Sequence, residues 1–125
     1  MAEQEEESDM NKSESIIQSE IRIALSKHGL VFRTNAGEFW QGKQVYSQEF
    51  KQRILINLRP VQGLPSGFSD LIFVGNGSVA FVETKRLGEN PRLDQEQFLA
   101  TMRRMNHAAG VARSVDDALA LIGVL

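Results

Sequence analysis

The sequence predicts an α/β fold in which helices flank a mixed central sheet. One observation is a hairpin over residues 70–85 that is apolar on both faces, as in strands covered on both sides. A second is the run of strand, helix and strand from residue 78 to residue 113, which implies a parallel strand pair. With 125 residues, the chain has the length of one domain with one core.

The composition is that of an ordinary globular protein, with 42% hydrophobic and 24% charged residues. The chain has no cysteine, which excludes disulfides and thiolate metal sites. It contains no apolar run of membrane-spanning length. We therefore expect a cytoplasmic protein, or one in the host-cell cytoplasm if its source is viral, with no membrane partner.

The first residues form a separate acidic segment. Residues 1–9 supply five of the sixteen acidic side chains, and the other eleven stand against fourteen basic ones, so the remainder carries +3. Such a charge block is typical of a solvated tail, and we expect residues 1–12 to be disordered and residues 13–125 to form the folded domain. A charge of +3 is compatible with a polyanionic partner.

Helical spacing of apolar residues begins the folded part, between a serine start and the closing Gly29. A second stretch, residues 34–52, holds four aromatic residues without a clear period, and we interpret it as a long loop or ragged ribbon. The expected elements of this half are a helix from Ser13 or Ser15, a strand over residues 30–33, a strand over residues 53–58 and a loop over residues 60–67.

The dipeptide Asn76-Gly77 is a strong signal for a two-residue hairpin turn. If Gly75 faces Ser78, Asp70 faces Glu83 across the hairpin, and like charges at such a position destabilise the pair. A divalent cation would offset the repulsion, since carboxylate oxygens bind hard cations. Lys85 lies two residues beyond Glu83, on the same face of the strand. The alternative is that Glu83 and Lys85 form only the solvated end of a strand and that Asp70 caps the preceding turn.

The segment after the hairpin predicts a loop over residues 86–92 and then a helix. Asp94 is the expected N-cap and Gln97 the N3 partner of a capping box, with the helix ending near Gly110. Residues 111–113 then predict a short buried strand, and Ser114 is expected to cap a final helix.

Several of these segments together resemble the VRR-NUC family of the PD-(D/E)XK nuclease superfamily. Gly67-Phe68-Ser69-Asp70 followed by Glu83-Thr84-Lys85 is similar to the family's Gly-x-Pro-Asp and Glu-x-Lys, with Ser69 in place of the proline. Four further segments match in order: the opening helix from Glu14 to Leu25, Arg33 to Gly37, Leu93 to Gln97, and Val111 to Val115. The resemblance implies a restriction-endonuclease-like αβββαβ core and a stand-alone phage or bacterial protein similar to Holliday-junction resolvases.

The resemblance also implies roles for individual residues. Asp70, Glu83 and the Thr84 carbonyl would hold Mg²⁺ or Mn²⁺, and Lys85 would act on the attacking water and the phosphate. Glu14 and Gln18 share one helix face, which the resemblance places over the site. For Gln97, a catalytic role and a capping role are equally good interpretations.

Basic side chains are candidates for phosphate contacts, and the alternative for each is a solvated surface. They are Arg33, Lys43, Lys51, Arg53, Arg86, Arg92, Arg103 and Arg104. Trp40, Tyr46 and Phe50 are candidates either to stack on unpaired bases or to form a dimer contact.

We therefore expect a metal-dependent, structure-selective DNA endonuclease that acts as a homodimer on branched DNA such as Holliday junctions. One alternative is a non-cleaving DNA-binding module of the same fold that acts with a partner. Another is a hydrolase of a small phosphorylated substrate. The acid, acid and lysine set favours the endonuclease.

Overall fold

A computed structural model describes residues 11–36 and 38–125 of the chain, so most of the predicted acidic tail lies outside the described residues. The elements are α2 (Glu14–Ser26), β1 (Leu30–Arg33), β2 (Glu38–Ser47), β3 (Gln52–Gln62), β4 (Leu71–Gly75), β5 (Ser78–Thr84), α3 (Leu93–Arg104), β6 (Ala108–Ala112) and α4 (Val115–Leu121).

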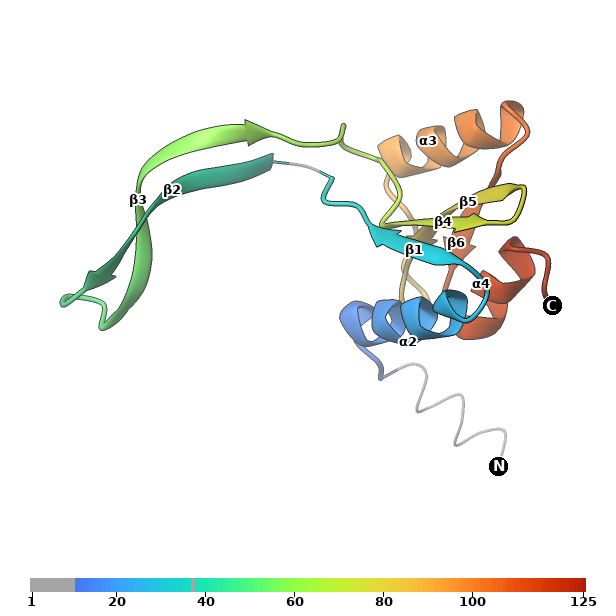
Figure 1. The fold of residues 1–125 in the computed structure, drawn as a ribbon, viewed down its shortest axis with the longest axis horizontal. Coiled ribbons are helices and arrows are strands. Elements are labelled where there is room, and N and C mark those ends of the chain that lie inside the picture. Colours follow the sequence, from blue (N-terminus) through green and yellow to red (C-terminus); the bar gives the residue numbers. More distant parts are fainter. Residues whose placement is uncertain (1–10, 37) are drawn as a thin grey trace.

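The body of the molecule has three layers around a mixed sheet. Its strand order is β1-β4-β5-β6, in which β1 and β5 run antiparallel to β4 while β6 runs parallel to β5. Helix α3 covers one face of the sheet, and α2 and α4 cover the other (Figure 1). The predicted α/β class with a mixed, helix-flanked sheet is confirmed, and the arrangement is that of a restriction-endonuclease-like fold.

The hairpin register is the one that the turn predicts. Gly75 pairs with Ser78, and the ladder continues without a shift to the pair Leu71 and Val82. Gly77 has a φ of 72°, as a tight two-residue turn of this type requires. Asp70 is the next residue beyond the last pair and therefore stands at the mouth of the hairpin, beside the end of β5.

Helix α2 forms because its apolar side chains recur at helical spacing. Ser13 caps it by accepting a hydrogen bond from the Ile16 N–H at 3.2 Å. Its buried residues Ile17, Ile21 and Leu25 pack against the sheet in the main core. Full burial of each such side chain stabilises the fold by roughly 1.5–3 kcal/mol. This packing holds the first turn of α2 next to the mouth of the hairpin.

The opposite face of the sheet packs through aromatic rings. The Phe68 and Phe98 ring centroids lie 4.4 Å apart, and Phe81 meets both rings edge to face. Phe98 belongs to α3 and Phe81 to β5, so this cluster positions α3 over the sheet.

The last turn of α3 differs from the prediction that it ends near Gly110. The helix ends at Arg104, Asn106 has a φ of 67°, and Gly110 lies within β6. A Cβ at Gly110 would lie 2.8 Å from the Leu121 side chain, so this glycine permits the close packing of α4 on β6. Ser114 caps α4 as predicted, accepting from the Asp117 N–H at 3.1 Å. No helix within the described residues combines the length and apolarity needed to span a membrane.

Strands β2 and β3 form a separate two-stranded ribbon, here called the arm, that projects from the body (Figure 1). This agrees with a ribbon over residues 34–52, but the loop predicted to begin at Pro60 is wrong, because β3 continues to Gln62 and Pro60 pairs with Trp40. Proline is tolerated there because both strands of a two-stranded ribbon are edge strands. The register shifts between Gln41 and Lys43, which breaks the period-2 pattern that sequence reasoning needs.

Candidate metal centre

A cavity of about 410 Å³ opens at the mouth of the hairpin. The first turn of α2, the residue before β4, the end of β5 and the first turn of α3 all contribute to it. Its charged and amide side chains are those of Glu14, Arg33, Asn35, Asp70, Glu83, Lys85, Arg92 and Gln95. With Arg33 at the end of β1, five separate segments of the sequence therefore place ionisable groups around one space.

Three carboxylates converge in this cavity. One oxygen from each of Glu14, Asp70 and Glu83 lies within 4.8 Å of the others. Like charges at this separation repel, and an oxygen-only donor set of this kind suits a hard divalent cation. The cluster therefore fits a hard divalent cation bound through oxygen atoms.

Glu83 is the most buried of the three, with 1% of its surface exposed. Its Oε1 accepts a hydrogen bond from Gln95 Nε2 at 2.9 Å, while its Oε2 is buried without a hydrogen-bond partner among the described residues. Burial, followed by the negative charge of Asp70, raises the pKa of Glu83 to about 8. A cation bound at Oε2 would satisfy this atom and keep the group ionised.

Asp70 is held by backbone groups on both sides. Its Oδ2 accepts from the Thr84 N–H at 2.9 Å, and its carbonyl accepts from the Thr34 N–H at 2.8 Å. The preceding Ser69 is fully buried, and its carbonyl accepts from the Thr34 hydroxyl. The Ser69 hydroxyl donates to the Leu71 carbonyl at 3.1 Å. These contacts restrain the segment where a proline would otherwise supply rigidity.

Lys85 completes the cluster. Its backbone N–H donates to the Ala112 carbonyl at 3.2 Å, which extends the pairing of β5 with β6 by one residue. The side chain is buried, with 8% exposed. Its positive charge lowers the pKa of Glu14 and Glu83, although burial is the larger influence and raises the pKa of Glu14 overall. A buried ammonium group therefore lies close enough to the carboxylates to act on their charge.

Comparison with known proteins agrees with this geometry. The VRR-NUC domain matches residues 12–116, which is most of the chain. The chain belongs to the VRR-NUC family. Membership implies a nuclease-type function and DNA binding, and divalent metals are typical of these nucleases. No curated protein and no solved structure matched the chain in the other two comparisons.

The glutamine that reaches the metal centre of this VRR-NUC protein is Gln95. The predicted capping box began at Asp94, but the N-cap is Arg92, so the N3 position falls on Gln95. Gln95 Oε1 accepts from the Arg92 N–H at 2.8 Å while Nε2 donates to Glu83. Gln97 is exposed and does not line the cavity. The prediction of the capping register was wrong because an arginine side chain offers no acceptor and gives no N-cap signal.

Asp94 supports the N-terminus of α3 from outside the carboxylate cluster. It accepts from the Ser66 hydroxyl at 2.7 Å and from Arg92 Nε at 3.2 Å. These contacts, with the Ser66 hydroxyl first, lower the pKa of Asp94. Ser66 and Gly67 line the cavity, so this network ties the segment before Asp70 to α3.

Two other predicted ligands lie differently. Gln18 is half-buried one helical turn after Glu14, and it does not line the cavity. Thr84 is fully buried; its N–H binds Asp70, and its hydroxyl has no hydrogen-bond partner among the described residues. Of the two, the Thr84 backbone is the one in direct contact with a cluster member.

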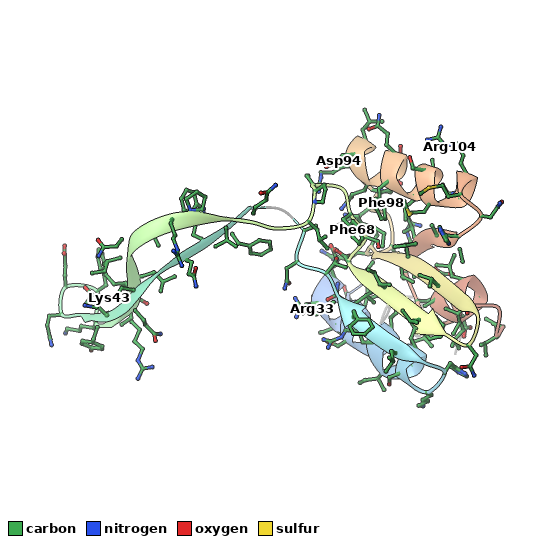
Figure 2. The ribbon with its side chains drawn as sticks, turned by 45° about the horizontal axis from the view of Figure 1, so that its top comes forward. Arg33, Lys43, Phe68, Asp94, Phe98 and Arg104 are labelled. Atoms are coloured by element: carbon green, nitrogen blue, oxygen red, sulfur yellow. The ribbon has the colours of Figure 1, made fainter. Side chains whose placement is uncertain are left out.

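The predicted DNA-contacting side chains fall into three places. Arg33 and Arg92 line the cavity, and Arg86 follows β5 with its guanidinium 3.7 Å from Glu89. Lys43, Lys51 and Arg53 lie on the arm. Figure 2 labels Lys43, which lies far from the body. Arg103 donates to the Ala109 carbonyl and Arg104 to the Thr101 hydroxyl, so both guanidinium groups already have hydrogen-bond partners within the fold.

Sequence reasoning missed several residues that line the metal cavity. They are Thr34, Asn35, Phe39, Ser66 and Gln95. Thr34 and Asn35 belong to the segment that resembles the family's Arg-x-Asn-x-Gly turn, so the resemblance offered a signal for them. Phe39 gave no such signal, because its approach depends on where the arm leaves the body.

Proposed function

We propose that this VRR-NUC protein is a Mg²⁺- or Mn²⁺-dependent, structure-selective DNA endonuclease that hydrolyses phosphodiester bonds on branched DNA such as Holliday junctions. The observation that carries the proposal is the cluster of Glu14, Asp70 and Glu83 beside Lys85. A carboxylate cluster together with a buried lysine suits phosphodiester hydrolysis, in which negative charge grows on the phosphate.

Asp70, Glu83 and the Thr84 carbonyl would hold the metal, with Glu14 as a further ligand; Gln18, which does not line the cavity, is given no role at the metal. When bound, the metal acidifies a water molecule and neutralises charge on the scissile phosphate. Two observations support this assignment: Glu83 Oε2 has no hydrogen-bond partner in the described part of the chain, and the carboxylates repel one another.

Lys85 acts on the reacting atoms from the protein side. Its ammonium group would orient the attacking water and stabilise negative charge as the new bond to phosphorus forms and the bond to the leaving oxygen breaks. Gln95 is a positioning residue, since it holds Glu83 through Oε1 and leaves Oε2 for the metal. We therefore assign to Gln95 the role expected of Gln97.

The surrounding cations suit a DNA backbone. Arg33 and Arg92 line the cavity itself, while Arg86, Lys43, Lys51 and Arg53 extend the positive surface to the loop and the arm. Phosphate contacts of this kind make affinity fall steeply with salt. A small phosphorylated substrate would not need cations on the arm.

We also propose a homodimer, because symmetric cutting of a junction needs two sites. The distal arm, residues 43–58, supports this proposal. It exposes Tyr46, Phe50, Leu55 and Leu58, each by 47% or more. An isolated two-stranded hairpin is at best marginally stable in water, so a second copy that covers these side chains would stabilise it.

Cleavage of a DNA panel tests the proposal. Holliday junctions, flaps and linear duplexes of matched sequence are incubated with Mg²⁺ or Mn²⁺, and with EDTA as the metal-free control. We expect metal-dependent cleavage of branched DNA and a loss of at least about 100-fold in Asp70→Asn and Lys85→Met proteins. Glu96→Gln removes an exposed carboxylate on α3 and should cut normally. Metal and DNA binding without cleavage would instead indicate a non-cleaving module.

A further inference from the structure

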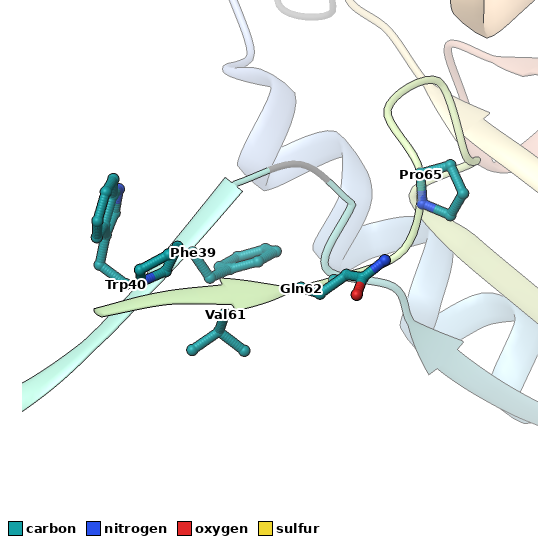
Figure 3. Close-up of a pocket in the computed structure, with 7 residues that line it drawn as sticks. Phe39, Trp40, Val61, Gln62 and Pro65 are labelled. Atoms are coloured by element: carbon teal, nitrogen blue, oxygen red, sulfur yellow. The ribbon is translucent and has the colours of Figure 1, made fainter. Parts of the chain in front are cut away.

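A second cavity, of about 490 Å³, lies at the base of the arm (Figure 3). We call it the arm-base cavity. It is lined by aromatic rings, prolines and a single amide side chain: Phe39, Trp40, Pro60, Val61, Gln62, Gly63 and Pro65. The distal arm contributes nothing to it.

The strand register builds this cavity. Phe39 pairs with Val61 and Trp40 with Pro60, so rigid side chains face one another on neighbouring strands. Trp40 remains 55% exposed although it lies within the ribbon. Its ring is therefore available to a planar partner, and Gln62 lies at the same cavity with both a donor and an acceptor.

Phe39 joins the arm-base cavity to the metal centre, because it lines both. The junction is tightly built. A Cβ at Gly63 would lie 3.0 Å from the Phe39 ring and 3.1 Å from the Asn35 carbonyl, and Ala36 bridges to Leu64. A molecule that extends from the carboxylate cluster along this junction would meet the Phe39 ring next.

The two adjoining cavities match the two chemically different parts of a nucleotide, its phosphate and its base. The metal centre offers carboxylates for a metal together with Arg33 and Arg92, which suit a phosphate. The arm-base cavity offers ring faces and one amide, which suit a heterocyclic base. A base inside a duplex is stacked on its neighbours, so only an unpaired base could enter.

We propose that the arm-base cavity binds one unpaired nucleobase of the DNA strand whose phosphate lies at the metal centre, with Trp40 as its stacking surface. This inference rests on the proposed endonuclease function. It would give the proposed preference for branched DNA a physical origin, since a flap carries unpaired bases and opening one base pair next to a branch costs less than opening one inside linear duplex.

Trp40 makes the proposal measurable, because it is the only tryptophan in the chain. Its fluorescence is followed while the full-length protein is titrated with a branched oligonucleotide in Ca²⁺, which replaces Mg²⁺ to suppress cutting. Single abasic sites are then placed at each nucleotide near the branch. We expect the parent DNA to quench the Trp40 fluorescence. An abasic site at one particular position should abolish this quenching and weaken DNA binding on the order of tenfold. Equal quenching by every abasic DNA, or none by the parent, would overturn the proposal.

Variants separate stacking from folding. Trp40→Phe should retain the tenfold preference for the base over the abasic site, whereas Trp40→Leu should lose it without weakening binding of the abasic DNA. Phe32→Leu, at an exposed aromatic residue on β1, serves as the control and should retain the preference. If Trp40 emission shifts with protein concentration in the absence of DNA, a second copy covers the cavity and the proposal is wrong.

The two proposals fail in different ways. Quenching that depends on the base, without any cleavage, would refute the proposed endonuclease function and would still support the base-binding site. Cleavage that depends on Asp70, together with equal Trp40 quenching by every abasic DNA, would refute only the base-binding site.

Discussion

Gln95 donates a 2.9 Å hydrogen bond to one carboxylate oxygen of Glu83 and leaves the other oxygen buried, with no hydrogen-bond partner among the residues that the structure describes. The same side chain accepts from the Arg92 N–H at the start of α3. The N-terminus of a helix on one face of the sheet is therefore coupled directly to a strand residue of the metal centre.

Gln95→Ala should reduce cleavage about tenfold and destabilise the fold by about 1–3 kcal/mol, because it removes a buried hydrogen bond to a charged group. Gln95→Glu keeps the acceptor for Arg92 but places a second negative charge against Glu83. Its cleavage profile should shift to higher pH, because the added charge raises the pKa of Glu83 further. Cleavage kinetics from pH 6 to pH 9 measure the reduced rate of Gln95→Ala and the shifted pH profile of Gln95→Glu, and urea unfolding measures the stability of Gln95→Ala.

Gln97→Ala is the matched control for this prediction, since Gln97 lies on the same helix and is exposed. Its cleavage should stay within about twofold of the unmodified protein, as is usual for surface changes. A larger loss in Gln97→Ala than in Gln95→Ala would contradict the assignment of the positioning role to Gln95.

The metal-free protein should become less stable as pH rises from about 5 to about 8. The folded-state pKa of Glu83 is about 8 and its ordinary value is 4.5, so in this window the folded state holds a proton that the unfolded state has released. Stability from this group is complete below pH 4.5 and is lost as pH rises through 8. Thermal unfolding in EDTA should show a loss on the order of 2 kcal/mol.

Glu83→Gln removes the titrating group, so its unfolding profile should be flatter than that of the unmodified protein over the same window. Glu96→Gln, at an exposed position, should reproduce the unmodified profile. Mn²⁺ should stabilise the unmodified protein more at pH 8 than at pH 6, because the metal competes with the proton. Parallel profiles for Glu83→Gln and the unmodified protein would refute the predicted role of Glu83.

Gly67→Ala should destabilise the fold by more than about 2 kcal/mol. Gly67 has a φ of 92°, and a Cβ there would lie 2.6 Å from the Asp94 carbonyl oxygen, so backbone strain and overlap add together. Gly88→Ala is the control: its φ is 83° but the space around it is open, and the expected loss is about 1 kcal/mol. Urea unfolding compares the two, and equal losses would show that the contact with Asp94 is unimportant.

Leu55→Asp should convert the proposed homodimer to a monomer, because it places a charge among the exposed apolar side chains of the distal arm. Leu93→Asp introduces the same change at a 69% exposed leucine on α3 and should leave the dimer intact. Light scattering after size-exclusion chromatography gives the mass of each. A monomeric unmodified protein at micromolar concentration would exclude the dimer.

Local signals predicted the approach of the carboxylates and the body of the fold well. Asn76-Gly77 predicted the hairpin register, and with it the approach of Asp70 to Glu83, because turn chemistry sets the pairing of the flanking strands. Ser13 and Ser114 predicted helix starts because their hydroxyl groups cap the backbone.

Other features could not be predicted from sequence because their determinants are not local. The arm has a register shift and exposed apolar residues on its strands, so its sequence lacks the alternation that marks a half-buried strand. Helix α3 begins after Arg92, whose side chain has no acceptor for an N-cap. The sequence therefore pointed to Asp94 as the N-cap and to Gln97 as its partner, whereas the partner in the structure is Gln95. The place of Phe39 between the two cavities depends on tertiary packing alone.

The bridge between Ala36 and Leu64 has a consequence for how the protein can be engineered. It brings the two ends of the arm together at the body, so the chain leaves and re-enters the domain at one point. The arm is thus an insertion that could be exchanged for a short linker, or for the arm of a related nuclease, without moving Glu14, Asp70, Glu83 or Lys85. Chimaeras of this kind would separate the chemistry of cutting from the choice of substrate.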